Sequence, residues 1–261
     1  TTPARCFRWA FSVNCVLIDR VGKRFAPVVA MLIAGATEAA AQNTSSVSSP
    51  VVTEDRKEIS YRFGWTPGES GSGDSYVHRF DYGFALNARS SLKLNARWED
   101  QPGSDLRFDN INAELLFELT PETAKFWQSG VRFDGRISNG PDSERIAVHW
   151  LNRWNFDNGI QVRAQLIAKR AFGGNADDAI VFEGRSSAST RLGDGYSIAL
   201  LGFFDLGTSE DFGPGGQDSQ IGPTISGPLG GSGWTWTAGN LFGTSGDAPD
   251  NDVRLWLARE F

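Results

Sequence analysis

The sequence predicts an all-β fold: a transmembrane, antiparallel, up-and-down β-barrel of about twelve strands, with ten strands as the alternative if residues 220–242 do not form a hairpin. Three observations predict this fold. Apolar and polar residues alternate along about twelve segments. The segments run to about 9–13 residues, the length that a tilted strand needs to cross a bilayer. Long and short connections alternate between them, as expected of a meander with two different ends.

Residues 1–41 are expected to be an N-terminal extension followed by a signal peptide. Two basic residues at 23–24 precede an apolar run at 25–36, which is too short to span a bilayer as a helix. The small residues at 39–41 form a cleavage signature, so we expect cleavage after Ala41. A short buried helix is the alternative interpretation of the apolar run.

Composition argues against several classes of function. The formal net charge is −6 and the pI is about 5.0, whereas a nucleic-acid partner would call for a basic stripe. Cys6 and Cys15 both precede the expected cleavage site, so neither a disulfide framework nor a cysteine metal site is expected in the mature chain. The sequence contains no dinucleotide-binding or phosphate-binding loop and no metal-binding motif, so no cofactor and no metal are expected.

Residues 42–56 are rich in Ser, Thr and charge and are expected to form a flexible periplasmic leader, with the barrel over residues 57–261. In the barrel, one side of nearly every segment is apolar and often aromatic while the other is polar, as in the first segment, where Tyr61 and Phe63 flank Arg62. In chain order, the expected strands lie at about 59–65, 76–88, 92–98, 111–119, 131–137, 146–156, 160–169, 180–191, 198–204, 220–229, 234–242 and 253–261.

The connections define two ends of the expected barrel. Asp194 and Gly195 form a dipeptide that is typical of a two-residue hairpin turn. An even number of strands places both chain ends on one side, which we assign to the periplasm together with the short connections; the long connections are then extracellular. The short connections are expected near 89–91, 120–125, 157–159, 193–195 and 230–233, and the long ones at 66–75, 100–105, 138–144, 173–178, 207–219 and 244–251.

Alternation alone does not say which side of each strand is inside, because a soluble β-sandwich alternates in the same way around an apolar core. Aromatic residues at the segment ends favour the membrane barrel, since aromatic girdles mark both interfaces of such barrels. In hydrocarbon every backbone donor and acceptor needs a partner within the protein, so the sheet is expected to close on itself. The aromatic residues at segment ends are Trp65, Tyr76, Trp98, Trp127, Trp154, Phe156, Tyr196 and Trp234.

The last segment alternates to the end of the sequence, from Val253 through Leu255 to Phe261. With this strand and the pattern over residues 57–261, the sequence resembles the outer-membrane β-barrels of Gram-negative bacteria. The resemblance implies export through the periplasm to the outer membrane, where lipid and lipopolysaccharide surround the barrel. It also implies that Phe261 is the assembly signal through which the C-terminal strand meets the barrel-assembly machinery.

If the apolar side faces lipid, the polar side lines the lumen, where basic residues outnumber acidic ones by about twelve to seven. A net-basic lumen lowers the energy of an anion inside it, so the leading hypothesis is a small channel or porin that favours small anionic solutes. In strand number and arginine-rich lumen, the sequence resembles the twelve-stranded porins for acidic sugars. The alternative is a plugged, structural barrel without transport. The expected pore-lining basic residues are Arg62, Arg79, Lys93, Arg97, Arg132, Arg136, Arg153, Arg163, Lys169, Arg185, Arg191 and Arg254. The expected acidic residues of the lumen are Asp81, Glu99, Glu114, Glu118, Asp134, Glu183 and Asp205.

An outer-membrane, lipid-modifying enzyme is a further and less favoured hypothesis. Twelve-stranded outer-membrane phospholipases use a Ser/His/Asn arrangement on the outer wall, but here the only histidines are His78 and His149. His78 lies on the apolar side of its segment without an identifiable partner, and His149 lies on the polar side, where a lumenal hydrogen bond is expected. No GxSxG motif is present, so no catalytic residue is assigned.

Acidic residues gather in the long connections. Two interpretations stay open: these carboxylates bind divalent ions that bridge lipopolysaccharide phosphates, or they are simply solvated. None of the connections has the spacing of a calcium-binding loop.

Overall fold

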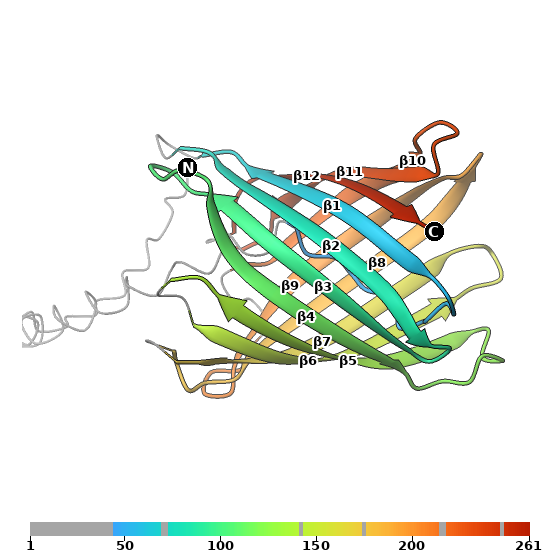
Figure 1. The fold of residues 1–261 in the computed structure, drawn as a ribbon, viewed down its shortest axis with the longest axis horizontal. Helices are drawn as coiled ribbons and strands as arrows, with labels where there is room; N and C mark the ends of the chain where they lie inside the picture. The colour runs from blue at the N-terminus through green and yellow to red at the C-terminus, as the bar shows by residue number, and fades with distance from the viewer. Residues whose placement is uncertain (1–43, 69–72, 141–142, 174–175, 214–217, 246–247) are drawn as a thin grey trace, which may run out of the picture. The chain divides into compact units, whose positions relative to one another are not determined.

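The computed structural model describes residues 44–68, 73–140, 143–173, 176–213, 218–245 and 248–261. Within them, twelve antiparallel strands close into a barrel in which strands consecutive in sequence are neighbours and β1 pairs with β12 (Figure 1). The predicted all-β barrel of twelve strands is confirmed, and the ten-strand alternative is wrong because residues 220–242 form a hairpin. No helix among these residues is long and apolar enough to cross a membrane. The strands are β1 (Lys57–Thr66), β2 (Ser75–Asn87), β3 (Ser90–Asp100), β4 (Arg107–Glu118), β5 (Trp127–Ser138), β6 (Glu144–Asn155), β7 (Gln161–Phe172), β8 (Val181–Gly193), β9 (Tyr196–Thr208), β10 (Gln220–Pro228), β11 (Trp234–Gly243) and β12 (Asp252–Glu260).

The pairing of β1 with β12 closes the barrel. The two strands are in register along most of their length, and Lys57 and Phe261 exchange two backbone hydrogen bonds of 3.1 and 3.0 Å. Closure removes the sheet edges, so the strands satisfy one another's backbone donors and acceptors, as a hydrocarbon environment requires. Phe261 therefore completes the barrel, and its role as an assembly signal stays a prediction.

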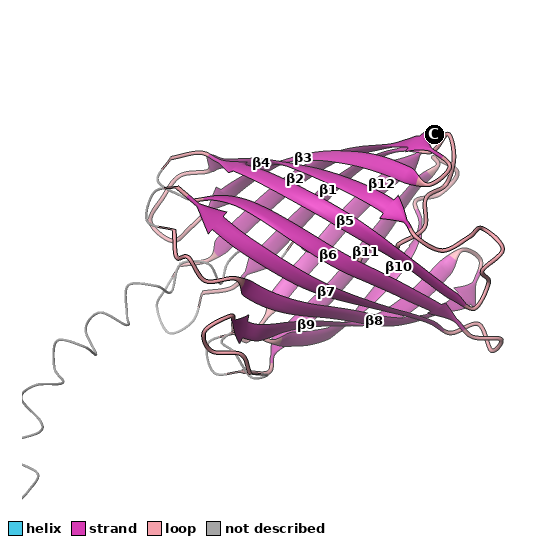
Figure 2. Ribbon diagram, turned by 90° about the horizontal axis from the view of Figure 1, so that it is seen from below, coloured by secondary structure: helices cyan, strands magenta, loops and turns pink. Residues whose placement is uncertain are grey.

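The apolar side of the strands faces outward. Phe80, Trp150 and Leu166 are 53%, 50% and 51% exposed on the outer wall, whereas Arg62 and Gln165 keep only 8% and 1% exposure inside. Figure 2 shows the tilted strands running around the barrel. A β-sandwich would bury those apolar side chains in a common core, so the sandwich alternative is wrong. A closed sheet with an apolar exterior is the surface that a β-protein presents to lipid.

The connections separate a short-connection end, where residues 57 and 261 lie, from a long-connection end. At the short-connection end, Asp194 and Gly195 have φ of 50° and 81°, the left-handed values that the predicted two-residue hairpin turn requires. The predicted difference in length does not hold for every pair of connections. The connection at 119–126, on the short-connection end, is longer than those at 101–106 and 139–143 on the opposite end, and those at 156–160 and 229–233 are as long as the one at 139–143.

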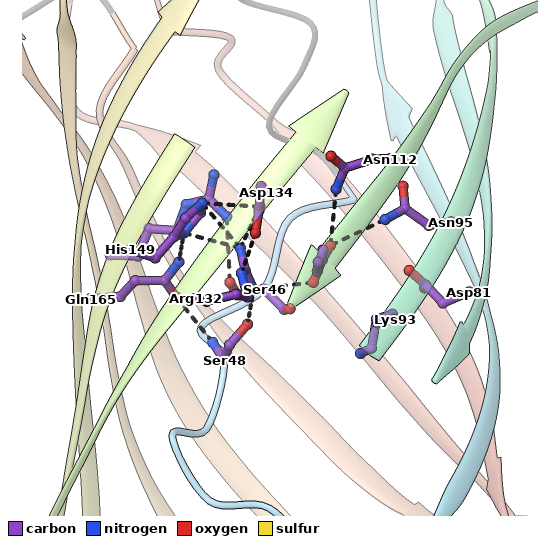
Figure 3. A network of polar contacts seen from close by, with 12 residues as sticks. Ser46, Ser48, Asp81, Lys93, Asn95, Asn112, Arg132, Asp134, His149 and Gln165 are labelled. Carbon is purple, nitrogen blue, oxygen red and sulfur yellow. Dashed lines mark hydrogen bonds and ion pairs between the residues drawn. The ribbon is translucent and has the colours of Figure 1, made fainter. Parts of the chain in front are cut away.

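The expected N-terminal extension and signal peptide (1–41), with its cleavage after Ala41, lie outside the described residues. Of the expected leader, residues 44–56 are described, and the structure differs from the expectation of a leader outside the barrel. Residues Thr44–Thr53, which we call the lumenal segment, run inside the lumen, where Figure 3 shows Ser46 and Ser48. A turn at Asp55, with φ of 59°, then leads into β1. The physical reason is a set of arginine contacts described below.

Candidate functional site: the barrel lumen

The twelve predicted pore-lining basic residues all lie on the polar, lumen-facing side of their strands. All except Arg191, which is exposed near the short-connection end of β8, make hydrogen bonds or ion pairs with described residues. Their role in lining a pore stays a proposal. Five of the partners of these basic residues are predicted lumenal acids: Asp81, Glu99, Glu114, Asp134 and Glu183.

A buried ion-pair cluster crosses β2, β4 and β5. Arg79 lies 2.6 Å from Asp81 and 2.7 Å from Glu114. Arg132 lies 3.2 Å from the other oxygen of Glu114 and 2.7 Å from Asp134 (Figure 3). Glu114 thus joins two arginines across the lumenal wall. Such buried pairs keep their charges only because each charge has a close opposite partner.

His149 belongs to the same network. Its Nδ1 accepts hydrogen bonds from Gln165 Nε2 at 2.6 Å and Arg132 Nη2 at 3.0 Å. Its Nε2 therefore carries the proton and donates to Asp134 Oδ2 at 3.0 Å (Figure 3). The predicted lumenal hydrogen bonding of His149 is confirmed.

The second histidine, His78, lies on the outer wall. Its Nδ1 is 2.8 Å from the hydroxyl of Tyr61 on the neighbouring strand, and its ring lies between the rings of Tyr61 and Phe63. A polar pair of this kind satisfies both groups on a face that is otherwise apolar. The absence of enzymatic activity stays a prediction.

The opposite wall of the lumen, from β8 to β10, carries small hydroxyl-bearing side chains near the short connections, beyond the Arg185–Glu183 ion pair of β8. Because these side chains are short, they leave space along the barrel axis. The expectation of a net-basic lumen did not include this asymmetry, although the serines on the polar side of β8 were a visible signal. The hydroxyl-bearing residues of this wall are Ser187, Ser189, Ser197, Thr224 and Ser226.

Six lumenal arginines hold the lumenal segment. Most of these contacts go to backbone carbonyl oxygens, which accept hydrogen bonds from the guanidinium groups, and the others go to serine hydroxyls. The carbonyl contacts are Arg62 to Thr44 (3.1 Å), Arg254 to Ser45 (2.9 Å), Arg185 to Ser46 (3.5 Å) and Arg163 to Val47 (3.4 Å). The hydroxyl contacts are Arg62 to Ser46 (2.9 Å), Arg132 to Ser48 (2.7 Å) and Arg153 to Ser49 (3.4 Å).

An apolar contact also anchors the segment. Val47 packs in a small buried cluster with Leu201, Phe203 and Leu241, which project inward from β9 and β11. Three residues further on, Pro50 is buried against β5. The segment therefore combines polar contacts along its backbone with two apolar contacts, at Val47 and Pro50.

Gly130 on β5 makes room for Pro50. A Cβ added at Gly130 would lie 3.1 Å from Pro50 Cβ and 3.0 Å from the carbonyl oxygen of Phe117. We expect Gly130→Ala to lower the free energy of unfolding by about 1–3 kcal/mol, because overpacking forces backbone shifts. Urea-induced unfolding in lipid vesicles measures this change. The control is Gly135→Ala on the same strand, where a Cβ meets no described atom within 4 Å; equal loss in both variants would contradict the prediction.

A cavity of about 530 Å³ lies beside the lumenal segment, in the half of the lumen near the short connections. Arg153 and Arg163 line it. Arg153 donates to Gln128, and Arg163 donates to Gln161 at 2.8 Å. Neither arginine has a carboxylate within ion-pair distance in the described part of the chain, and with Arg56, Lys93 and Arg132 they outnumber the two glutamates, Glu58 and Glu114, that also line the cavity.

At the long-connection end, Asp74 ties the β1–β2 connection to the aromatic girdle. Its carboxylate accepts hydrogen bonds of 3.0 Å from Trp65 Nε1, the Tyr76 hydroxyl and the Gly68 amide. These donors, led by the Gly68 amide, hold the pKa of the Asp74 carboxyl below its usual range. Across the described residues, no group of three or more carboxylates or imidazoles is arranged to hold a metal ion; divalent-ion binding by the loops stays a prediction.

Comparison with known proteins supports the fold. No protein-family model and no curated protein sequence matches the chain. Among solved structures, the chain is similar to the KdgM porin (TM-score 0.53, 13% identity, 78% of this chain and 99% of that one). It is also similar to the KdgM porin in complex with disordered oligogalacturonate (TM-score 0.54, 12% identity, 78% and 99%). A third similar structure is the COG4313 outer membrane channel from Pseudomonas putida F1 (TM-score 0.59, 10% identity, 83% and 100%).

The chain has the fold of outer-membrane β-barrel channels. With its apolar exterior and closed sheet, this fold implies the bacterial outer membrane as the location. At identities of 10–13%, the similarity extends to the fold and not to a substrate.

Proposed function

We propose that the protein is an outer-membrane channel whose net-basic lumen favours small anionic solutes. The observation that carries the proposal is the pair Arg153 and Arg163, which face a lumenal cavity without a carboxylate partner among the described residues. Positive charge in a narrow space with low-dielectric walls raises the local concentration of anions. The hydroxyl groups of the opposite wall provide hydrogen-bonding partners for a hydroxylated solute.

Acidic sugars are the solute class that we propose. Their carboxylates suit guanidinium groups and their hydroxyls suit a wall of serines. The similar KdgM structure is described as a complex with oligogalacturonate, a solute of this kind. The proposal assigns no enzymatic activity, no cofactor and no metal to this chain.

A plugged, structural barrel is the second candidate function. The observation that favours it is the lumenal segment, which lies across the path that a solute would take. The ion pairs of Arg79 and Arg132 with Glu114 also fill part of the lumen.

Uptake of sugars by liposomes that contain the protein distinguishes the two functions. We expect trigalacturonate, with three carboxylates, to enter about tenfold faster than neutral maltotriose of similar size, because the lumen concentrates anions. The double variant Arg153→Glu and Arg163→Glu is expected to lose this preference. The control is Arg170→Glu, which makes the same substitution at one residue near the long-connection end of β7, at a side chain that is 45% exposed and paired with Asp178.

Two results would contradict the channel proposal. Entry of neither sugar through a barrel shown to be folded favours the structural barrel. A preference for trigalacturonate that the control loses as fully as the double variant would mean that lumenal charge is not its source.

A further inference from the structure

The lumenal segment carries no charged side chain, although the lumen around it is rich in arginine. Residues 44–53 read TSSVSSPVVT. They offer carbonyl and hydroxyl oxygens to Arg62, Arg132, Arg153, Arg163, Arg185 and Arg254. The guanidinium groups of these arginines thus bind a neutral segment, although guanidinium groups bind anions more strongly.

We propose that the lumenal segment is a displaceable stopper: it occupies the anion path, and a linear anionic solute releases it by taking over its arginine contacts. The proposal rests on the proposed function and adds its regulation. The carboxylates of the solute replace the carbonyl and hydroxyl oxygens of the segment, most directly at Arg153 and Arg163. A neutral sugar lacks the charge that makes this exchange favourable.

Displacement is favourable because a guanidinium group binds the carboxylate of a solute more strongly than it binds the neutral oxygens of the lumenal segment. A hydrogen bond from a guanidinium group to a carboxylate is roughly twice as strong as one between neutral groups and stronger than one to a carbonyl oxygen. Arg153, Arg163 and Arg185 contact the segment at 3.4–3.5 Å, which is long for a hydrogen bond. Of these three, Arg153 and Arg163 line the cavity of about 530 Å³, which gives the solute room to approach, so their contacts with the segment are the most accessible to exchange.

The lumenal wall keeps its charge balance when the segment leaves. Four of the six arginines have a carboxylate partner on the wall itself, at 2.7–3.1 Å, so the loss of the segment leaves none of these four unpaired. These pairs are Arg62 with Asp81, Arg132 with Asp134, Arg185 with Glu183 and Arg254 with Asp252. Release is therefore compatible with a barrel that stays closed.

The apolar packing of the Val47 side chain keeps the stopper in place. Its side chain is 7% exposed and packs against Leu201, Phe203 and Leu241. By contrast, Val148 is 45% exposed on the outer wall of β6 and lies outside this cluster. Removing the side chain of Val47 should loosen the stopper, whereas removing that of Val148 removes equal volume outside the lumen.

Two opposite variants test the proposal by single-channel recording in planar bilayers. Wild-type protein is expected to show low open probability, raised by trigalacturonate and not by maltotriose. Val47→Gly should be open without sugar, while the matched control Val148→Gly should behave as wild type. Ser49→Asp adds a carboxylate next to Arg153, so it should tighten the stopper and raise by about tenfold the trigalacturonate concentration needed for opening. Heat-modifiable migration on gels confirms that each barrel is folded.

The outcomes separate this inference from the proposed function. The stopper is refuted if wild type conducts as freely as Val47→Gly without sugar, if Ser49→Asp opens at the wild-type concentration, or if maltotriose opens the channel as well as trigalacturonate. In each of these cases the channel itself stands. A complete lack of conductance in folded wild type and in a folded variant without residues 45–52 would refute the channel function. If Val47→Gly does not fold, Ser49→Asp decides alone.

Discussion

Glu114→Gln is expected to lower the free energy of unfolding by about 3 kcal/mol, although it changes the size of the side chain very little. Glu114 is 7% exposed and pairs with both Arg79 and Arg132. Glutamine keeps a hydrogen-bonding oxygen but removes one negative charge from a buried cluster. Removing one partner of a buried ion pair costs about 3–5 kcal/mol, and the lower end applies because Arg79 and Arg132 each keep an aspartate. Urea-induced unfolding in lipid vesicles, followed by tryptophan fluorescence, measures the loss.

Asp178→Asn is the control for this variant. Asp178 pairs with Arg170 at 3.0 Å, but its side chain is 97% exposed, so this pair is screened by water. Exposed pairs contribute about 0–1 kcal/mol. If the two variants lost the same stability, the lumenal cluster would be as hydrated as the surface, and its arginines would not need their partners.

The barrel was predictable because its signals are local in the sequence. Period-two alternation tells which residues share a side, as with Phe80 and Asp81, which the structure places on the outer and inner faces. Turn dipeptides such as Asp194-Gly195 mark where strands end. Each signal is read within about ten residues, and together these signals define a meander that closes.

The Gly-rich hairpin of β10 and β11 was the least certain part of the pattern, and the structure gives the reason. A Cβ at Gly222 would lie 1.9 Å from the carbonyl oxygen of Asn240, and one at Gly239 would lie 2.5 Å from Thr224 Cγ2. The two strands approach so closely here that glycine is required. These glycines lie on the inner side of their strands, so here the polar side chains that alternate with the apolar ones elsewhere are missing from the sequence pattern.

The lumenal segment was not predictable, because its contacts are non-local. Ser48 bonds to Arg132 and Gln165, which lie 84 and 117 residues away. A neutral stretch rich in serine reads as a linker when it is considered alone. Only the shape of the lumen, with Arg132 on one wall and short hydroxyl side chains on the other, makes it a binding site for that stretch.

Leu166→Arg is expected to lower the free energy of unfolding in lipid by about 2–4 kcal/mol. Leu166 lies near the middle of β7, and its side chain is 51% exposed on the outer wall. A charged side chain on the lipid face is most costly at the bilayer midplane, because the charge loses its hydration. Equilibrium folding into phosphocholine vesicles measures this cost.

A second substitution, at a different depth in the bilayer, shows whether hydrocarbon surrounds the barrel. Leu192 is 58% exposed on the same outer wall, but it lies at the short-connection end of β8, next to the Asp194-Gly195 turn. Leu192→Arg is therefore expected to cost only about 0–1 kcal/mol, because its guanidinium group reaches the interface. Destabilisation that rises from Leu192 to Leu166 requires hydrocarbon around the middle of the barrel, since in water two equally exposed leucines would tolerate arginine equally. Equal and small losses at both positions would place the outer wall in water and would remove the basis for the inward-facing arginine lumen.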